Sequence, residues 1–122
     1  MKRTIPILAA AAAVLVTMSA FAGGPPKKTP ELLKQGKASY EANCAACHGD
    51  TGKGDGPAGA ALEPKPRDLV RGSFKKGIQP AQVFQTISKG IDGTTMAPFE
   101  YLPEAERWAV TYYTLELRSA KK

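Results

Sequence analysis

The feature that most constrains this chain is the run Cys44-Ala45-Ala46-Cys47-His48-Gly49, which holds both cysteines and the single histidine of the 122 residues. Cys-x-x-Cys-His is the attachment signal for c-type haem. The two thiols add across the two vinyl groups of the porphyrin, and the imidazole that follows becomes an axial ligand of the iron. The motif therefore predicts a covalent tether at Cys44 and Cys47 and a proximal iron bond from His48.

Three other interpretations of the motif stay open at this point. A thioredoxin-like redox pair would lie near a βαβ pattern, and the sequence has no convincing strand. A zinc site needs four ligands, so it would require carboxylates or a second chain. A structural disulfide between Cys44 and Cys47 is sterically possible. The adjoining histidine and an export signal favour haem attachment.

The N-terminal segment has the three parts of a cleavable secretory signal. Met1-Lys2-Arg3 supplies the cations, residues 5–22 are apolar, and Ala20-Phe21-Ala22 has the small-x-small pattern of a cleavage site. We expect cleavage after Ala22 and a periplasmic protein. An uncleaved membrane anchor is the alternative, although the apolar run is near the lower limit for spanning a bilayer.

This prediction divides the chain into a signal (1–22), a flexible leader (23–29) and one small domain (30–122). The domain is small, so we expect a bound cofactor to form part of its core. Lys2 and Arg3 leave with the signal and no acid does, which lowers the net charge from +6 to +4. Aromatic residues do not alternate with basic ones, so we expect no nucleic-acid partner.

Proline and small polar residues predict where three helices begin. The first runs from Pro30 to about Asn43 behind an N-cap at Thr29, the second from Pro80 to about Lys89 with Gly90 as its C-cap, and the last starts at Pro103. With no strand pattern, the expected fold is all-α, with about three to five helices around one haem.

A six-coordinate haem needs a second axial donor. His48 is the only histidine, and Met96 is the only methionine left once the signal is removed. Met96 lies in a loop between two predicted helices, so we expect it to be the distal ligand, with lysine, tyrosine or water as the alternatives. A His/Met pair fills both axial positions, which suits an electron carrier and leaves no open position for substrate.

Residues between the motif and the second helix are candidates for the haem surroundings. A rigid carbonyl in the loop 64–69 is expected to accept the hydrogen bond from the second nitrogen of His48, with Pro66 preferred over Pro64. Arg67 and Arg71 are candidates to face the haem propionates, with solvated roles as the alternative. Phe99, close after Met96, is expected near the haem.

With these residues placed, the chain resembles the class I c-type cytochromes, in particular small monohaem proteins of the bacterial periplasm. The resemblance covers residues 30–118 and includes the haem motif, the Met96 loop and the aromatic last helix. It implies an all-α fold whose first and last helices cross nearly perpendicularly. It also implies that Gly36 lies at the crossing, against Tyr113 or Tyr112.

The resemblance implies a monomeric one-electron carrier that exchanges electrons with other redox proteins. Lys75, Lys76 and Lys89 are candidates to steer acidic partners, or else are simply solvated. The membrane would be reached only through partner complexes or an uncleaved signal. The alternatives are an electron-transfer subunit of a larger oxidoreductase, a haem enzyme or gas sensor in which Met96 dissociates, and a secreted binding domain with a disulfide.

Overall fold

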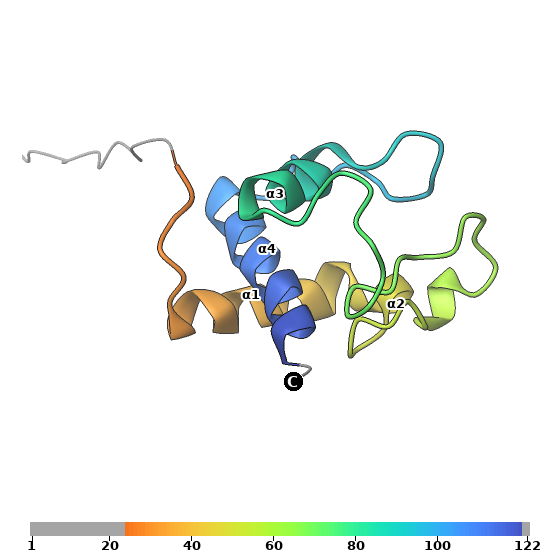
Figure 1. The fold of residues 1–122 in the computed structure, drawn as a ribbon, viewed down its shortest axis with the longest axis horizontal. Helices are drawn as coiled ribbons and strands as arrows, with labels where there is room; N and C mark the ends of the chain where they lie inside the picture. The colour runs from red at the N-terminus through yellow and green to blue at the C-terminus, as the bar shows by residue number, and fades with distance from the viewer. Residues whose placement is uncertain (1–23, 121–122) are drawn as a thin grey trace, which may run out of the picture.

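The computed structural model describes residues 24–120, and this part of the chain consists of helices and loops (Figure 1). The elements in chain order are α1 (Pro30–Asn43), α2 (Ala45–His48), the 3₁₀ helix η1 (Pro57–Gly59), α3 (Pro80–Lys89) and α4 (Glu104–Ser119). The all-α prediction is confirmed. The predicted signal, 1–22, lies outside the described residues, among which no helix is long and apolar enough to span a bilayer.

The predicted helix ends agree with the observed ones because they follow from local backbone chemistry. The Thr29 hydroxyl accepts a hydrogen bond from the Leu32 N–H at 3.1 Å, which satisfies one of the free donors at the start of α1. Gly90 follows α3 at φ +70°, a conformation that favours glycine, and Pro103 directly precedes α4. The sequence did not predict the four-residue α2.

Helix α4 crosses α1, as Figure 1 shows, and Gly36 lies at the crossing. A Cβ atom at this position would overlap the Ala109 carbonyl and would lie 2.9 Å from the Cβ of Tyr113. The expected close approach at Gly36 is therefore confirmed, with Tyr113 rather than Tyr112 as the aromatic neighbour. The glycine allows the two backbones to meet at a distance that no other residue would permit.

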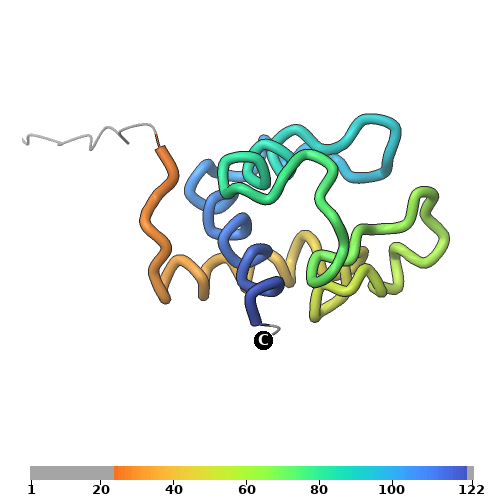
Figure 2. The backbone as a smooth tube through the Cα atoms, in the orientation of Figure 1, coloured from red at the N-terminus to blue at the C-terminus, as the bar shows by residue number. Residues whose placement is uncertain are grey.

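The sequence predicts a flexible leader over 23–29. In the structure, two of its residues contact the domain. The Tyr112 hydroxyl donates to the Pro26 carbonyl at 2.7 Å, and Lys28 forms an ion pair with Glu116 at 3.1 Å. Both partners belong to α4. The segment that descends toward α1 in Figure 2 is thus attached to the last helix at two points. The boundary between leader and domain remains a prediction.

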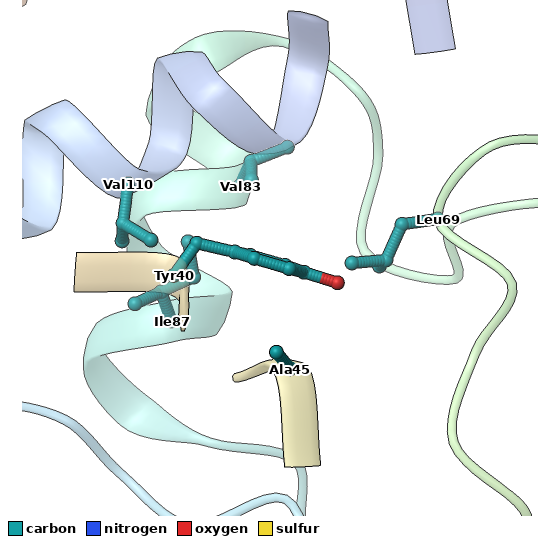
Figure 3. Close-up of a cluster of buried hydrophobic side chains, with 6 residues drawn as sticks. All are labelled: Tyr40, Ala45, Leu69, Val83, Ile87 and Val110. Atoms are coloured by element: carbon teal, nitrogen blue, oxygen red, sulfur yellow. The ribbon is translucent and has the colours of Figure 1, made fainter. Parts of the chain in front are cut away.

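The apolar core centres on Tyr40, which is completely buried (Figure 3). It brings together side chains from all four α-helices and from the loop that precedes α3. The Tyr40 hydroxyl donates to the Gly49 carbonyl at 2.7 Å, so the core is bonded directly to the end of the Cys-x-x-Cys-His run. The core residues are Tyr40, Ala45, Leu69, Val83, Ile87 and Val110.

Two long loops, 49–79 and 90–103, lie on the side of the molecule away from the leader (Figure 2). Arg118 of α4 holds part of the first one. Its guanidinium donates to the Leu69 and Gly72 carbonyls at 2.9 and 2.8 Å, and it lies 4.7 Å from the centre of the Phe74 ring. The last helix therefore supports a loop that forms one wall of the cavity described next.

Candidate haem site

A cavity of about 250 Å³ contains the residues that the sequence predicts as haem ligands. Cys44, Cys47 and His48 line it from the junction of α1 and α2, and Met96 lines it from the loop between α3 and α4. These two segments are about fifty residues apart in the sequence. The fold brings the attachment motif and the predicted distal ligand into one cavity.

Helix α2 arranges the motif through a single helical turn. The N–H groups of Cys47 and His48 both donate to the Cys44 carbonyl, at 3.2 and 2.9 Å. Residues three and four positions apart share one face of a helix, so the first thiol and the last two motif side chains can meet one ligand. This geometry explains why a haem motif imposes a short helix that propensity alone does not predict.

The thiols are free in the structure, and their environment is unlike that of a redox pair. Burial and, to a smaller extent, the neighbouring Cys47 together raise the pKa of Cys44 to about 11. A thioredoxin-like pair depends on a lowered thiol pKa. Among residues 24–120 no cluster of three or more His, Cys, Asp or Glu could hold a zinc ion. The redox-pair and zinc interpretations of the motif are therefore disfavoured.

The imidazole of His48 is held by a backbone carbonyl, with Nδ1 2.9 Å from the Arg67 oxygen. A carbonyl can only accept, so Nδ1 carries the proton. Burial lowers the pKa of His48, which favours the neutral ring, although this hydrogen bond partly offsets the effect. The lone pair of Nε2 is then available to a metal, which is the arrangement expected of a ligating histidine.

The acceptor is thus Arg67, and the preference for the Pro66 carbonyl was wrong. The chain path explains the difference. A Cβ atom on Gly54 would lie 2.6 Å from the Pro66 oxygen, so that carbonyl faces the glycine-rich loop after the motif. The next carbonyl in the chain is the one that reaches His48.

Most of the other residues that the sequence predicts to surround the haem line the cavity. Pro66, Arg67 and Phe99 all line it, and the Phe99 N–H donates to the Ile87 carbonyl at 3.0 Å, which ties the Met96 loop to α3. Arg71 does not line this cavity. It borders a separate hollow with Lys53, Asp68 and Val70, so the expectation that it faces the propionates is not supported.

The chemistry of the cavity lining suits a flat apolar ring with two carboxylates. Four cations line it, namely Lys65, Arg67, Lys75 and Lys76, and none of the described lining residues is acidic.

Several lining residues could not be predicted from the sequence because they come from three different segments and belong to no local motif. Thr114 is one of them: it is buried on α4. These unpredicted lining residues include Leu62, Leu69, Phe74, Val83, Thr86 and Thr114.

The fold, the motif and the cavity define a class I c-type cytochrome domain, a class that binds haem and transports electrons. The family model described as "Cytochrome C oxidase, cbb3-type, subunit III" matches residues 31–113. The chain therefore belongs to this family.

Curated relatives support the same assignment. The chain is 33% identical over 88 residues to the cbb3-type cytochrome c oxidase subunit CcoP of Azospirillum brasilense, covering 72% of this chain and 29% of that protein. It is 33% identical over 93 residues to the cbb3-type cytochrome c oxidase subunit FixP of Azorhizobium caulinodans, covering 76% and 29%. The chain thus spans less than a third of the length of these relatives.

Among solved structures, the fold is similar to a chain of the reducing HAO-like protein complex of Kuenenia stuttgartiensis. The TM-score is 0.72 and the sequence identity is 35%, over 78% of this chain and 47% of that chain.

Proposed function

We propose that this chain is a periplasmic one-electron carrier that binds a single haem c. Cys44 and Cys47 would hold the haem by thioether bonds, with His48 and Met96 as axial ligands. The observation that carries the proposal is that one cavity is lined both by the Cys-x-x-Cys-His motif and by Met96, which are far apart in the sequence. Residues 1–22 would direct export and would be removed by cleavage after Ala22.

When bound, the haem supplies an Fe(III)/Fe(II) couple. The chain's own residues determine how that couple is held. The Arg67 carbonyl fixes the proton on Nδ1 of His48 and so orients the ring. Occupation of both axial positions by His48 and Met96 would leave no position for a substrate, so the chain would transfer electrons without being an enzyme itself.

The visible spectrum of the exported, oxidised protein tests this proposal. We expect haem that stays with the polypeptide after acid–organic extraction, and a weak far-red band from methionine-to-ferric-iron charge transfer. Met96→Ala should abolish the band and give a high-spin spectrum. Met96→His should also abolish the band but keep a low-spin spectrum and lower the reduction potential, because a thioether favours Fe(II) more than imidazole does.

Other outcomes would contradict the proposal in identifiable ways. Bound haem without the far-red band would exclude Met96 as the ligand. Carbon monoxide binding by the reduced protein at neutral pH would favour a haem enzyme or gas sensor with a displaceable Met96. A colourless protein from a host with working haem-attachment machinery would favour a binding domain without haem.

A second function is an electron-transfer subunit of a larger oxidoreductase. It is supported by relatives that are named as oxidase subunits and by a structural neighbour from a protein complex. Purification of the tagged chain from its own host distinguishes the two functions. A free carrier should elute at the size of one domain, whereas a subunit should elute in a larger species with a stoichiometric catalytic chain.

A further inference from the structure

The loop that carries Met96 is tied to α3 by the Phe99 N–H, which donates to the Ile87 carbonyl at 3.0 Å, but the residues before Met96 bond mainly within the loop. Its tip is Gly93, at φ +74°, where an added Cβ atom would meet nothing within 4 Å. The two ends of the loop approach each other at its base: the Ile91 N–H donates to the Met96 carbonyl at 3.1 Å, and Gly90 packs closely against that carbonyl. The position of Met96 therefore depends mainly on bonds within the loop.

The Thr94 hydroxyl bridges the interior of this loop. It donates to the Ile91 carbonyl at 2.7 Å and accepts from the Met96 N–H at 3.1 Å. The Thr94 N–H donates to the same Ile91 carbonyl at 3.2 Å. One side chain thus links the Ile91 backbone to the Met96 backbone, and it uses both its donor and its acceptor capacity.

The neighbouring Thr95 provides a contrast. It lies between Thr94 and Met96, and its side chain is exposed and makes no hydrogen bond to the described residues. Both threonines line the cavity, Thr94 half-buried and Thr95 exposed, and only the Thr94 hydroxyl bonds to the Met96 backbone. This pair allows the contribution of the bridge to be separated from a general effect of removing a hydroxyl from the loop.

We propose that Thr94 is the positioning residue for Met96, and that its hydroxyl bridge holds the thioether toward the cavity. The inference rests on the proposed role of Met96 as distal ligand. Without the bridge, the Met96 N–H loses its partner, and the loop is closed only by backbone bonds, from Ile91 to Met96, from Thr94 to Ile91 and from Phe99 to Ile87. The loop would then open more readily, and Met96 would leave the iron more often.

Imidazole binding to the oxidised holo-protein measures this opening, because imidazole binds only when Met96 has left the iron. Loss of about one hydrogen bond predicts roughly fivefold tighter apparent imidazole affinity for Thr94→Val. The far-red band should also weaken in this variant. Thr94→Ser keeps the hydroxyl and should restore both values, and Thr95→Val should match the wild type.

The outcomes distinguish this inference from the proposed function. A wild type without the far-red band refutes Met96 ligation. If the wild type shows the band, Met96 ligation stands. The role of Thr94 is then refuted if Thr94→Val binds imidazole with wild-type affinity, or if Thr95→Val changes the affinity by the same factor. If Thr94→Val does not accumulate, hydrogen exchange of the Met96 amide in the wild type decides: a protected amide supports the bridge, and exchange at the rate of a free amide refutes it.

Discussion

At the scale of the residue, Tyr40 connects the apolar core to the haem motif. Its ring is packed among side chains of α3 and α4, and it lies 5.3 Å from the Tyr113 ring. Its hydroxyl reaches the Gly49 carbonyl, which directly follows the predicted proximal ligand His48. A substitution that removes the ring or the hydroxyl of Tyr40 should therefore affect both the stability of the fold and the position of the motif.

Tyr40→Phe removes the hydroxyl but keeps the ring. The Gly49 carbonyl then keeps only the Gly52 N–H as a donor, at 3.1 Å, so we expect the free energy of unfolding of the holo-protein to fall by about 0.5–1.5 kcal/mol. Guanidinium denaturation measures the change. Tyr101→Phe is the matched control, because Tyr101 is 71% exposed and its hydroxyl makes no hydrogen bond to residues 24–120. Equal stabilities for the two variants would argue against the Tyr40 bond.

Tyr40 should also make the free energy of unfolding depend on pH. Burial, with smaller contributions from Cys44 and other nearby groups, raises the pKa of Tyr40 above its ordinary value. A group whose pKa is raised on folding stabilises the fold fully below its unfolded pKa, about 10 for tyrosine, and the stabilisation is lost as the pH rises above that value. We expect the unfolding free energy to fall more steeply above pH 10 in the wild type than in Tyr40→Phe. Parallel curves would contradict this assignment.

At the scale of the element, the crossing of α1 and α4 fixes the framework on which the motif is held. Gly36 is disfavoured in a helix interior by about 1 kcal/mol relative to alanine, so its presence needs a reason in packing. The Ala109 carbonyl occupies the space where a side chain would lie. The intrinsic preference and the packing therefore act in opposite directions at this position.

Gly36→Ala distinguishes these effects. If packing dominates, the variant should lose roughly 1–3 kcal/mol of stability, because the added methyl group pushes the helices apart. Ala38→Gly, at an exposed position of the same helix, should lose about 1 kcal/mol from helix propensity alone. Thermal unfolding of the two holo-variants measures both. A gain in stability for Gly36→Ala would show that α1 and α4 can separate at little cost.

The helix ends could be predicted from the sequence because prolines, caps and glycines act on their own neighbours. Thr29, Pro80 and Gly90 are examples of such local signals. Helix α2 could not be predicted in this way, since its N-cap, Cys44, makes no side-chain capping bond. The Arg67 carbonyl was missed for a related reason: the path of the loop is set by its contact with Gly54, which no local pattern reveals.

At the scale of the whole molecule, the distribution of charge matters more than the net value. Lys65, Lys75 and Lys76 surround the cavity without an acidic lining residue among those described. Lys89, also predicted to steer partners, forms an ion pair with Glu100 and contributes less to such a field. The cavity side of the molecule should therefore attract anionic partners, and the effect should depend on ionic strength.

The prediction concerns the rate of reduction by an anionic reagent such as hexacyanoferrate(II). Lys75→Gln combined with Lys76→Gln should lower the second-order rate constant about two- to fivefold at low salt, because two exposed charges near the cavity are lost. The difference from the wild type should shrink as the salt concentration rises and the charges are screened. Stopped-flow absorbance of the haem gives the rates.

A control of equal net charge separates the local field from the overall charge. Lys27 and Lys34 are exposed, and neither lines the cavity or forms an ion pair in the described part of the chain. Lys27→Gln combined with Lys34→Gln removes the same two charges and should change the rate much less. If both pairs lower the rate equally, only net charge matters. If neither does, the lysines around the cavity are solvated side chains without a steering role, and partner selection must depend on shape and apolar contact at the haem edge.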